Sequence, residues 1–125
     1  MKILIVDDSM FIRNRIERSL GLRQISEVLT AKNGREAIVK FHHHKPELVT
    51  MDITMPEVDG IECTRRMVQL NSKVKILIVS AVADKATAIT ALKQGANGFL
   101  IKPFEEEQLN EALATLIDGR KRGRR

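Results

Sequence analysis

The chain has 125 residues, 43% of them hydrophobic, which fits one globular domain and excludes a two-domain enzyme. Its apolar runs are too short for a membrane span, and its one cysteine, Cys63, cannot form an internal disulfide, as suits a reducing cytoplasm. The net charge of +5 would suggest nucleic acid, but residues 120–125 carry five of the 21 basic side chains, so residues 1–119 are neutral overall.

Apolar runs and amphipathic stretches alternate along the chain. In order, the pattern predicts a strand at 3–6, a helix at 12–20, a strand at 28–31, a helix at 37–41, a strand at 48–51 and a helix at 61–68. A strand at 76–79, a helix at 88–92, a strand at 99–101 and a helix at 109–117 follow. The runs are continuous, as expected for strands buried on both faces, so we predict an α/β fold with a doubly wound parallel sheet.

The domain organisation follows from this alternation. We expect one domain over residues 1–118, because no linker or internal repeat interrupts the ten elements. Residues 119–125 contain only Gly, Arg and Lys, a composition that predicts a basic disordered tail.

Polar residues stand at the ends of the predicted strands. Asp7 and Asp8 follow the first strand, Asp52 the third, Ser80 the fourth and Lys102 the fifth. Open parallel sheets bind ligands at the carboxyl ends of their strands, so these side chains should converge. Three close carboxylates repel unless a cation such as Mg²⁺ joins them, and lysine and serine suit a phosphoryl group. The set predicts a Mg²⁺-dependent phosphoryl-transfer site.

A structural role explains each of these residues taken alone. Asp8 beside Ser9 has the position of a helix cap, Asp52 that of a turn residue, and a single lysine such as Lys102 is most often a solvated surface side chain. Their joint placement at strand ends favours a site.

Four sequence segments together resemble the receiver domain of two-component response regulators. They are residues 3–8 (ILIVDD), residues 51–60 (MDITMPEVDG), Ser80-Ala81 and residues 102–104 (KPF). The resemblance covers residues 1–118 and implies a flavodoxin-like (βα)5 fold with strand order 2-1-3-4-5. Residues 49–57 and the short chain are similar to single-domain chemotaxis regulators of the CheY type.

The resemblance implies a role for each site residue. Asp52 is the phosphoacceptor for a histidine kinase, and the chain is a signalling protein that catalyses only its own phosphorylation and dephosphorylation. Asp8, Asp52 and the backbone carbonyl of Thr54 bind Mg²⁺, with Asp7 acting largely through a metal-bound water. Lys102 contacts the phosphoryl group.

The resemblance also implies a conformational switch. Ser80 swings toward the phosphoryl group, Phe99 turns inward, and the surface of the last two helices and the last strand changes for a downstream partner, either the flagellar motor or another signalling target. The Lys102–Pro103 peptide bond is expected to be cis. We expect a monomer or weak dimer that has no membrane partner.

Other interpretations compete with this one. The chain could be the receiver of a longer DNA-binding regulator, or bind nucleic acid weakly through its tail. A phosphohydrolase is disfavoured, because such enzymes usually carry a carboxylate two residues after the nucleophile, where Thr54 stands. His42, His43 and His44 point in different directions on a helix and cannot share one ion, and we expect Cys63 to be a buried structural thiol.

Overall fold

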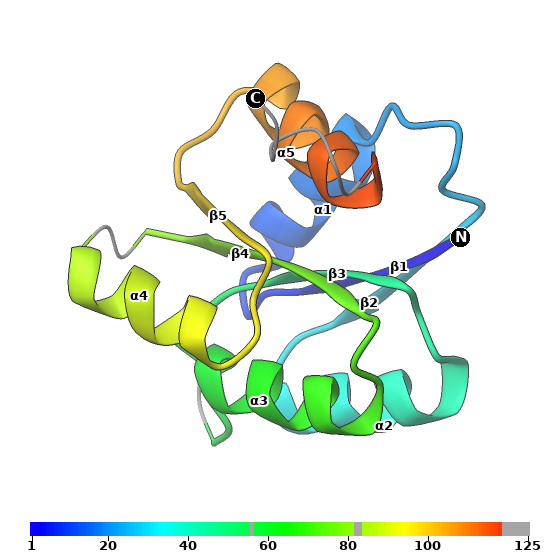
Figure 1. Cartoon of the computed structure of the whole chain (residues 1–125). Helices are drawn as coiled ribbons and strands as arrows, with labels where there is room; N and C mark the ends of the chain where they lie inside the picture. Colours follow the sequence, from blue (N-terminus) through cyan, green and yellow to red (C-terminus); the bar gives the residue numbers. More distant parts are fainter. Residues whose placement is uncertain (56, 82–83, 119–125) are drawn as a thin grey trace.

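The structure, a computed structural model, describes residues 1–55, 57–81 and 84–118 (Figure 1). The strands are β1 (Lys2–Val6), β2 (Glu27–Ala31), β3 (Leu48–Met51), β4 (Lys75–Ser80) and β5 (Gly98–Ile101). The helices are α1 (Met10–Ser19), α2 (Gly34–His44), α3 (Gly60–Leu70), α4 (Lys85–Lys93) and α5 (Glu106–Asp118). All strand pairs are parallel in the order β2-β1-β3-β4-β5, which confirms the predicted fold. The basic segment 119–125 lies outside the described residues.

The helices cover both faces of the sheet. Helices α1 and α5 lie on one face, and α2, α3 and α4 lie on the other (Figure 1). Side chains of a strand alternate between the faces, so Ile3 and Ile5 of β1 join the core under α1 and α5 while Leu4 and Val6 join the opposite core. Among the described residues, no helix is both long enough and apolar enough to cross a membrane.

The edge strands correct one expectation from the sequence. The central strands β1, β3 and β4 are buried almost throughout, as predicted. The edge strands β2 and β5 are only partly buried, and Ile101 of β5 is 45% exposed. The physical reason is position, because an edge strand has a neighbouring strand on one side only.

Side-chain caps fix the starts of four helices at the edge where the strands end. Ser9, Asn33, Asp59 and Asp84 each accept a hydrogen bond from the backbone N–H three residues later. These caps direct each chain segment back along the sheet and hold the loops of this edge in place. At the start of α4, the backbone N–H and the hydroxyl of Thr87 both donate to the carboxylate of Asp84. These hydrogen bonds lower the pKa of the Asp84 carboxyl.

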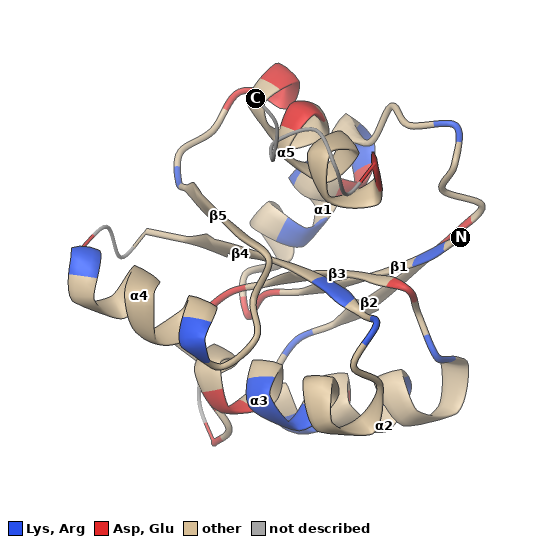
Figure 2. Cartoon of the chain, in the orientation of Figure 1, with Lys and Arg blue, Asp and Glu red and all other residues tan. Residues whose placement is uncertain are grey.

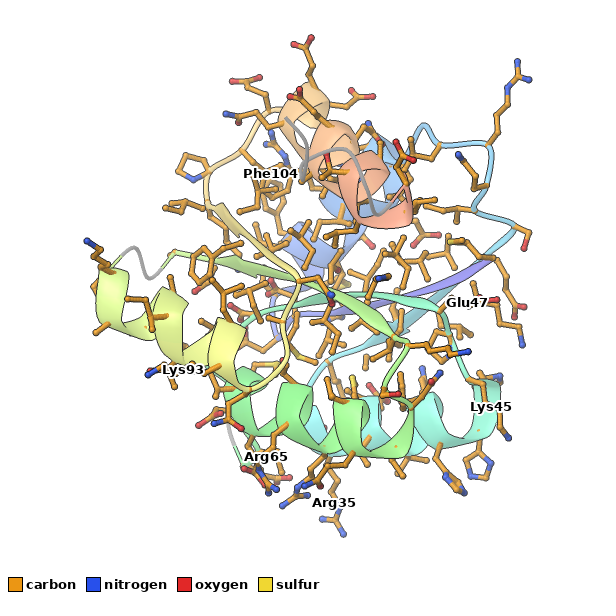
Figure 3. The ribbon with its side chains drawn as sticks, in the orientation of Figure 1. Arg35, Lys45, Glu47, Arg65, Lys93 and Phe104 are labelled. Carbon is orange, nitrogen blue, oxygen red and sulfur yellow. The ribbon has the colours of Figure 1, made fainter. Side chains whose placement is uncertain are left out.

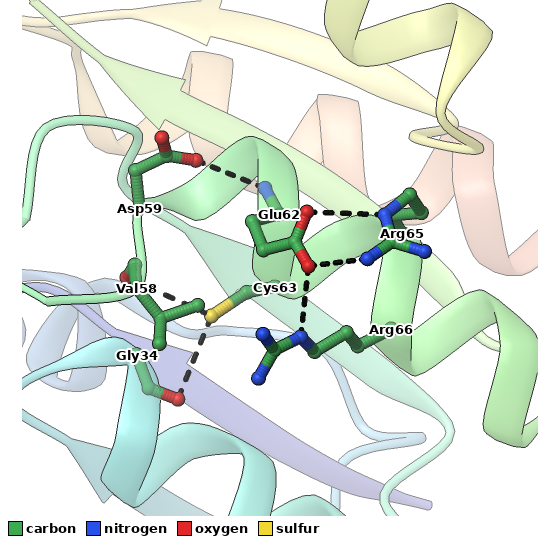
Figure 4. A network of polar contacts seen from close by, with 7 residues as sticks. All are labelled: Gly34, Val58, Asp59, Glu62, Cys63, Arg65 and Arg66. Carbon is green, nitrogen blue, oxygen red and sulfur yellow. Dashed lines mark hydrogen bonds and ion pairs between the residues drawn. The ribbon is translucent and has the colours of Figure 1, made fainter.

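The packing between α2 and α3 confirms the expectation for Cys63. Its thiol is fully buried and lies 3.5 Å from the carbonyl oxygen of Gly34 and 4.0 Å from that of Val58 (Figure 4). Burial raises the pKa of this thiol to about 12, so it is inert at neutral pH. The three histidines at the end of α2 are exposed, as expected.

Candidate functional site

The parallel sheet brings the predicted site residues to one edge. Asp7 directly follows β1, Asp52 follows β3, Ser80 ends β4 and Lys102 follows β5. Backbone hydrogen bonds extend the ladders to these positions, from Asp52 N–H to the Val6 carbonyl (3.0 Å) and from Lys102 N–H to the Ser80 carbonyl (2.9 Å). The backbones of Asp52 and Lys102 are therefore hydrogen-bonded to the neighbouring strands.

Three carboxylates form a compact cluster at this edge. Asp7, Asp8 and Asp52 each offer one oxygen, and these oxygens all lie within 4.8 Å of one another. Asp7 is 1% exposed and Asp52 is 5% exposed, whereas Asp8 is exposed, so the cluster opens to solvent on the side of Asp8. Ligands that are all oxygen suit a hard divalent cation, and the residues present fit Mg²⁺.

Lys102 bridges the two buried carboxylates. Its Nζ lies 2.8 Å from Oδ2 of Asp7 and 3.4 Å from Oδ1 of Asp52. The Lys102–Pro103 peptide bond is cis, as expected. The next residue, Phe104, packs in the core under α1 and α5 (Figure 3). The guanidinium of Arg15 lies over its ring, 5.1 Å from the ring centroid. Lys102 is therefore anchored on both sides along the chain.

Burial dominates the electrostatics of Asp52. Desolvation by burial and, to a lesser extent, the nearby charge of Asp7 raise the pKa of its carboxyl to about 6, although the ammonium of Lys102 acts in the opposite direction. A single lysine thus does not compensate for two buried carboxylates. The site retains an excess of negative charge that a divalent cation would neutralise.

Two residues that position Asp7 were not identified from the sequence. The backbone N–H of Ser9 donates to Oδ1 of Asp7 (2.9 Å), and Nη1 of Arg13 donates to the backbone carbonyl of Asp7 (2.7 Å). Ser9 shows no signal beyond that of a helix cap. Nothing in the sequence pattern separates Arg13 from the other arginines of α1, because its partner is a backbone atom.

Gly60 is a third residue whose role at the site the sequence did not indicate. It begins α3, and its N–H donates to the carbonyl of Ile53 (2.9 Å). A Cβ atom at this position would lie 2.0 Å from the backbone oxygen of Asp52. The pair Asp59-Gly60 is typical of a turn, but the close approach to the Asp52 backbone depends on the tertiary structure.

The remaining predicted residues lie on the neighbouring strands and in the loop after Asp52. Ser80 is buried at the end of β4, and Thr54 is exposed in the loop after Asp52. Phe99 of β5 is partly buried and packs on the core under α2, α3 and α4. A hollow of about 150 Å³ lies on the α5 side of β5 and is lined by Leu77, Phe99, Ala112, Thr115 and Leu116 among others.

Sequence comparisons place these features in a known group. The family model described as the response regulator receiver domain matches residues 3–114. The chemotaxis protein CheY of Listeria monocytogenes is 39% identical over 113 residues, which cover 90% of this chain and 95% of that protein. The transcriptional regulatory protein DegU of Brevibacillus brevis is 32% identical over 120 residues, which cover 95% of this chain and 51% of that protein.

Structural comparison agrees with the sequence comparisons. The CheY protein of Borrelia burgdorferi, in a complex with CheX, BeF3 and Mg²⁺, superposes with a TM-score of 0.88 and 28% identity. The match covers 94% of this chain and 89% of that chain. The two proteins therefore share the strand order and the position of the helices.

Proposed function

Because this chain belongs to the response regulator receiver domain family, we propose that Asp52 is its phosphoacceptor in a two-component system. The phosphoryl group would come from a histidine kinase of the cytoplasm. The observation that carries the proposal is the pairing of Lys102 with both Asp7 and Asp52 inside a cluster of three carboxylates. The chain acts as a signalling protein that modifies only itself.

In the proposed step, one carboxylate oxygen of Asp52 forms a bond to phosphorus while the bond from phosphorus to the donor nitrogen breaks. The departing imidazole takes a proton from solvent. The Nζ of Lys102 already lies between Asp7 and Asp52 and is placed to pair with a phosphoryl oxygen attached to Asp52. Ser80, at the end of the adjacent strand, would donate its hydroxyl proton to another phosphoryl oxygen.

The acidic cluster is the proposed Mg²⁺ site. Asp7, Asp8, Asp52 and the backbone carbonyl of Thr54 would hold the ion, with Asp7 acting largely through a bound water. When bound, the ion supplies positive charge that offsets the negative charge of the acceptor and of the phosphoryl group. The exposure of Asp8 leaves a route by which both the ion and the donor can enter.

We assign the output to the surface of α4, β5 and α5. Ile89 and Leu92 of α4 and Ile101 of β5 are exposed apolar side chains there, each more than 40% exposed. Such side chains suit a protein partner. In the proposed switch, Ser80 turns toward the phosphoryl group and the ring of Phe99 turns inward. The similarity to CheY proteins favours a chemotaxis partner such as the flagellar motor.

A phosphorylation assay tests the proposal. Incubation with Mg²⁺ and acetyl phosphate should add the mass of one phosphoryl group, and the Asp52→Asn variant should gain none. Glu57→Gln removes an exposed carboxylate from the same loop and serves as the matched control that is still modified. An Asp52→Asn protein that gains the same mass would refute the assignment, as would a wild-type protein that gains none.

The switch needs a separate measurement. Beryllofluoride with Mg²⁺ should shift the backbone amide resonances near Ser80, Phe99 and the α4–β5–α5 surface, and Asp52→Asn should abolish these shifts. Shifts confined to the acidic cluster would contradict the proposed output surface. The chain contains neither Trp nor Tyr, so NMR rather than intrinsic fluorescence is the suitable method.

A further inference from the structure

Helix α5 has a strongly negative net charge. It contains four acidic residues and no basic residue, and Glu105 immediately precedes it. Figure 2 shows this acidic character, which is strongest where α5 begins. Glu107 and Glu111 are exposed and one helical turn apart, so they lie on the same outer side of the helix.

These two carboxylates make no ion pair with any residue in the part of the chain that the structure describes. The contrast is Glu62 of α3, which binds both Arg65 and Arg66 (Figure 4). The inner side of α5 is occupied, because Leu109, Leu113 and Leu116 are buried in the core. Glu107 and Glu111 therefore form a negatively charged patch on the outer side of α5 that has no ion-pair partner among the described residues.

The sequence supplies a complementary segment next to this face. Residues 120–125 carry five positive charges and follow α5 after a single glycine. Eleven residues separate Glu107 from Asp118, a rise of about 16 Å along the helix. Six residues of extended chain span about 20 Å, so this segment is long enough to run back along α5 as far as Glu107.

We propose that residues 120–125 bind the outer side of α5 in the same molecule, with Glu107 and Glu111 as the main contacts. Exposed ion pairs are individually weak, but the short tether gives the segment a high local concentration at α5. The contact is electrostatic, so salt weakens it. It covers the flank of the output surface, and a partner that binds α5 must displace or include the basic segment.

The experiment uses the full chain with a spin label on this segment. The Gly123→Cys substitution introduces a reactive thiol, and Cys63 does not compete for the label because it is fully buried. In ¹⁵N-labelled protein at low salt, the nitroxide should broaden the amide signals of residues 107–111 more than those around Arg35 and Arg65 on the opposite layer (Figure 3). The reduced nitroxide provides the reference spectrum.

Charge variants identify the contacts. Glu107→Gln combined with Glu111→Gln should lower the binding equilibrium of the segment by about threefold or more, given the weakness of exposed ion pairs. Glu17→Gln combined with Glu57→Gln removes the same charge from other exposed positions and should leave the broadening of α5 unchanged. Addition of about 0.5 M NaCl should reduce the broadening in the unsubstituted α5.

Three results would overturn the proposal. One is broadening spread evenly over the surface at low salt. Another is equal broadening in a mixture in which one copy carries ¹⁵N but no nitroxide and the other carries the nitroxide but no ¹⁵N. That result would mean that the segment binds a second copy of the chain. The third is α5 broadening that Glu107→Gln with Glu111→Gln leaves unchanged. The contact does not involve Asp52, so the Asp52→Asn variant should show the same broadening of α5 although it is not phosphorylated. Failure of this inference and failure of the proposed function can therefore be distinguished.

Discussion

Asp52 combines a buried position with a charge that its surroundings do not fully neutralise. Its pKa in the folded protein is about 6, above the ordinary value of 3.8, so the folded state binds the proton more tightly than the unfolded chain does. The ionised carboxylate therefore costs stability at neutral pH. This cost falls as the pH drops through about 6 and is absent below the ordinary pKa.

The Asp52→Asn variant should consequently be more stable than the wild type at pH 8 without Mg²⁺. We expect a gain of about 1–3 kcal/mol in the free energy of unfolding, from a shift of roughly two pKa units. The gain should shrink below pH 6 and vanish near pH 4. Urea unfolding at several pH values measures it, and a gain that does not depend on pH would contradict the explanation.

Glu62 provides a comparison of opposite sign. Hydrogen bonds from Arg65 and Arg66 lower the pKa of its partly exposed carboxyl to about 2, so ionisation of Glu62 favours the folded state. Glu62→Gln should therefore reduce stability slightly at pH 7 rather than raise it. If Asp52→Asn and Glu62→Gln both raised the free energy of unfolding, the cause would be the lower negative charge of the whole protein and not the surroundings of each carboxyl.

Thr50 and Thr64 form a matched pair of fully buried hydroxyls. Thr64 Oγ1 donates to the carbonyl of Gly60 at 2.8 Å, whereas Thr50 Oγ1 has no hydrogen-bond partner among the described residues. Thr50→Val should raise the free energy of unfolding by about 1 kcal/mol, and Thr64→Val should lower it by a similar amount. Thermal unfolding of both variants checks the prediction, which fails if the two substitutions change stability in the same direction.

At the scale of elements, Gly60 joins α3 to the backbone of Asp52. Gly60→Ala would place a methyl group 2.0 Å from the Asp52 carbonyl oxygen, so the loop or the helix must move. We expect a loss of about 2 kcal/mol or more in stability and a reduced rate of phosphorylation at Asp52. Gly21→Ala is the control, because a Cβ atom at Gly21 would lie 3.7 Å from its nearest neighbour, the side chain of Asn110. Stability and the rate of phosphorylation should both be unchanged in this variant.

The elements also show how far the sequence predicts this structure. Continuous apolar runs located all five strands, and the polar residues after them indicated that Asp7, Asp8, Asp52 and Lys102 lie together, because parallel strands end at a common edge. The sequence did not indicate that Ile101 is exposed, since strand order and edge position are tertiary properties. It missed Arg13 and Gly60 because both contact backbone atoms, and such contacts do not require a particular side chain at the partner position.

At the scale of the whole molecule, repulsion among the site carboxylates should couple Mg²⁺ binding to stability. Binding of Mg²⁺ at the proposed site would require the folded chain, so saturating Mg²⁺ should raise the melting temperature by several degrees relative to NaCl of equal ionic strength. Asp8→Asn removes the exposed carboxylate of the cluster and should abolish most of this increase. Calorimetry measures the melting temperatures of the two proteins. An equal increase in the wild type and in Asp8→Asn would place the bound ion elsewhere.

The packing of α1 against α5 has a consequence for synthesis on the ribosome. Ile16 of α1 shares its core with Leu109 and Leu113 of α5, which are translated nearly a hundred residues later. Until α5 leaves the exit tunnel, the nascent chain has an apolar sheet face that only α1 can partly cover. Chaperones that bind exposed apolar surface therefore have a long interval to act, and this interval ends with the last helix of the domain.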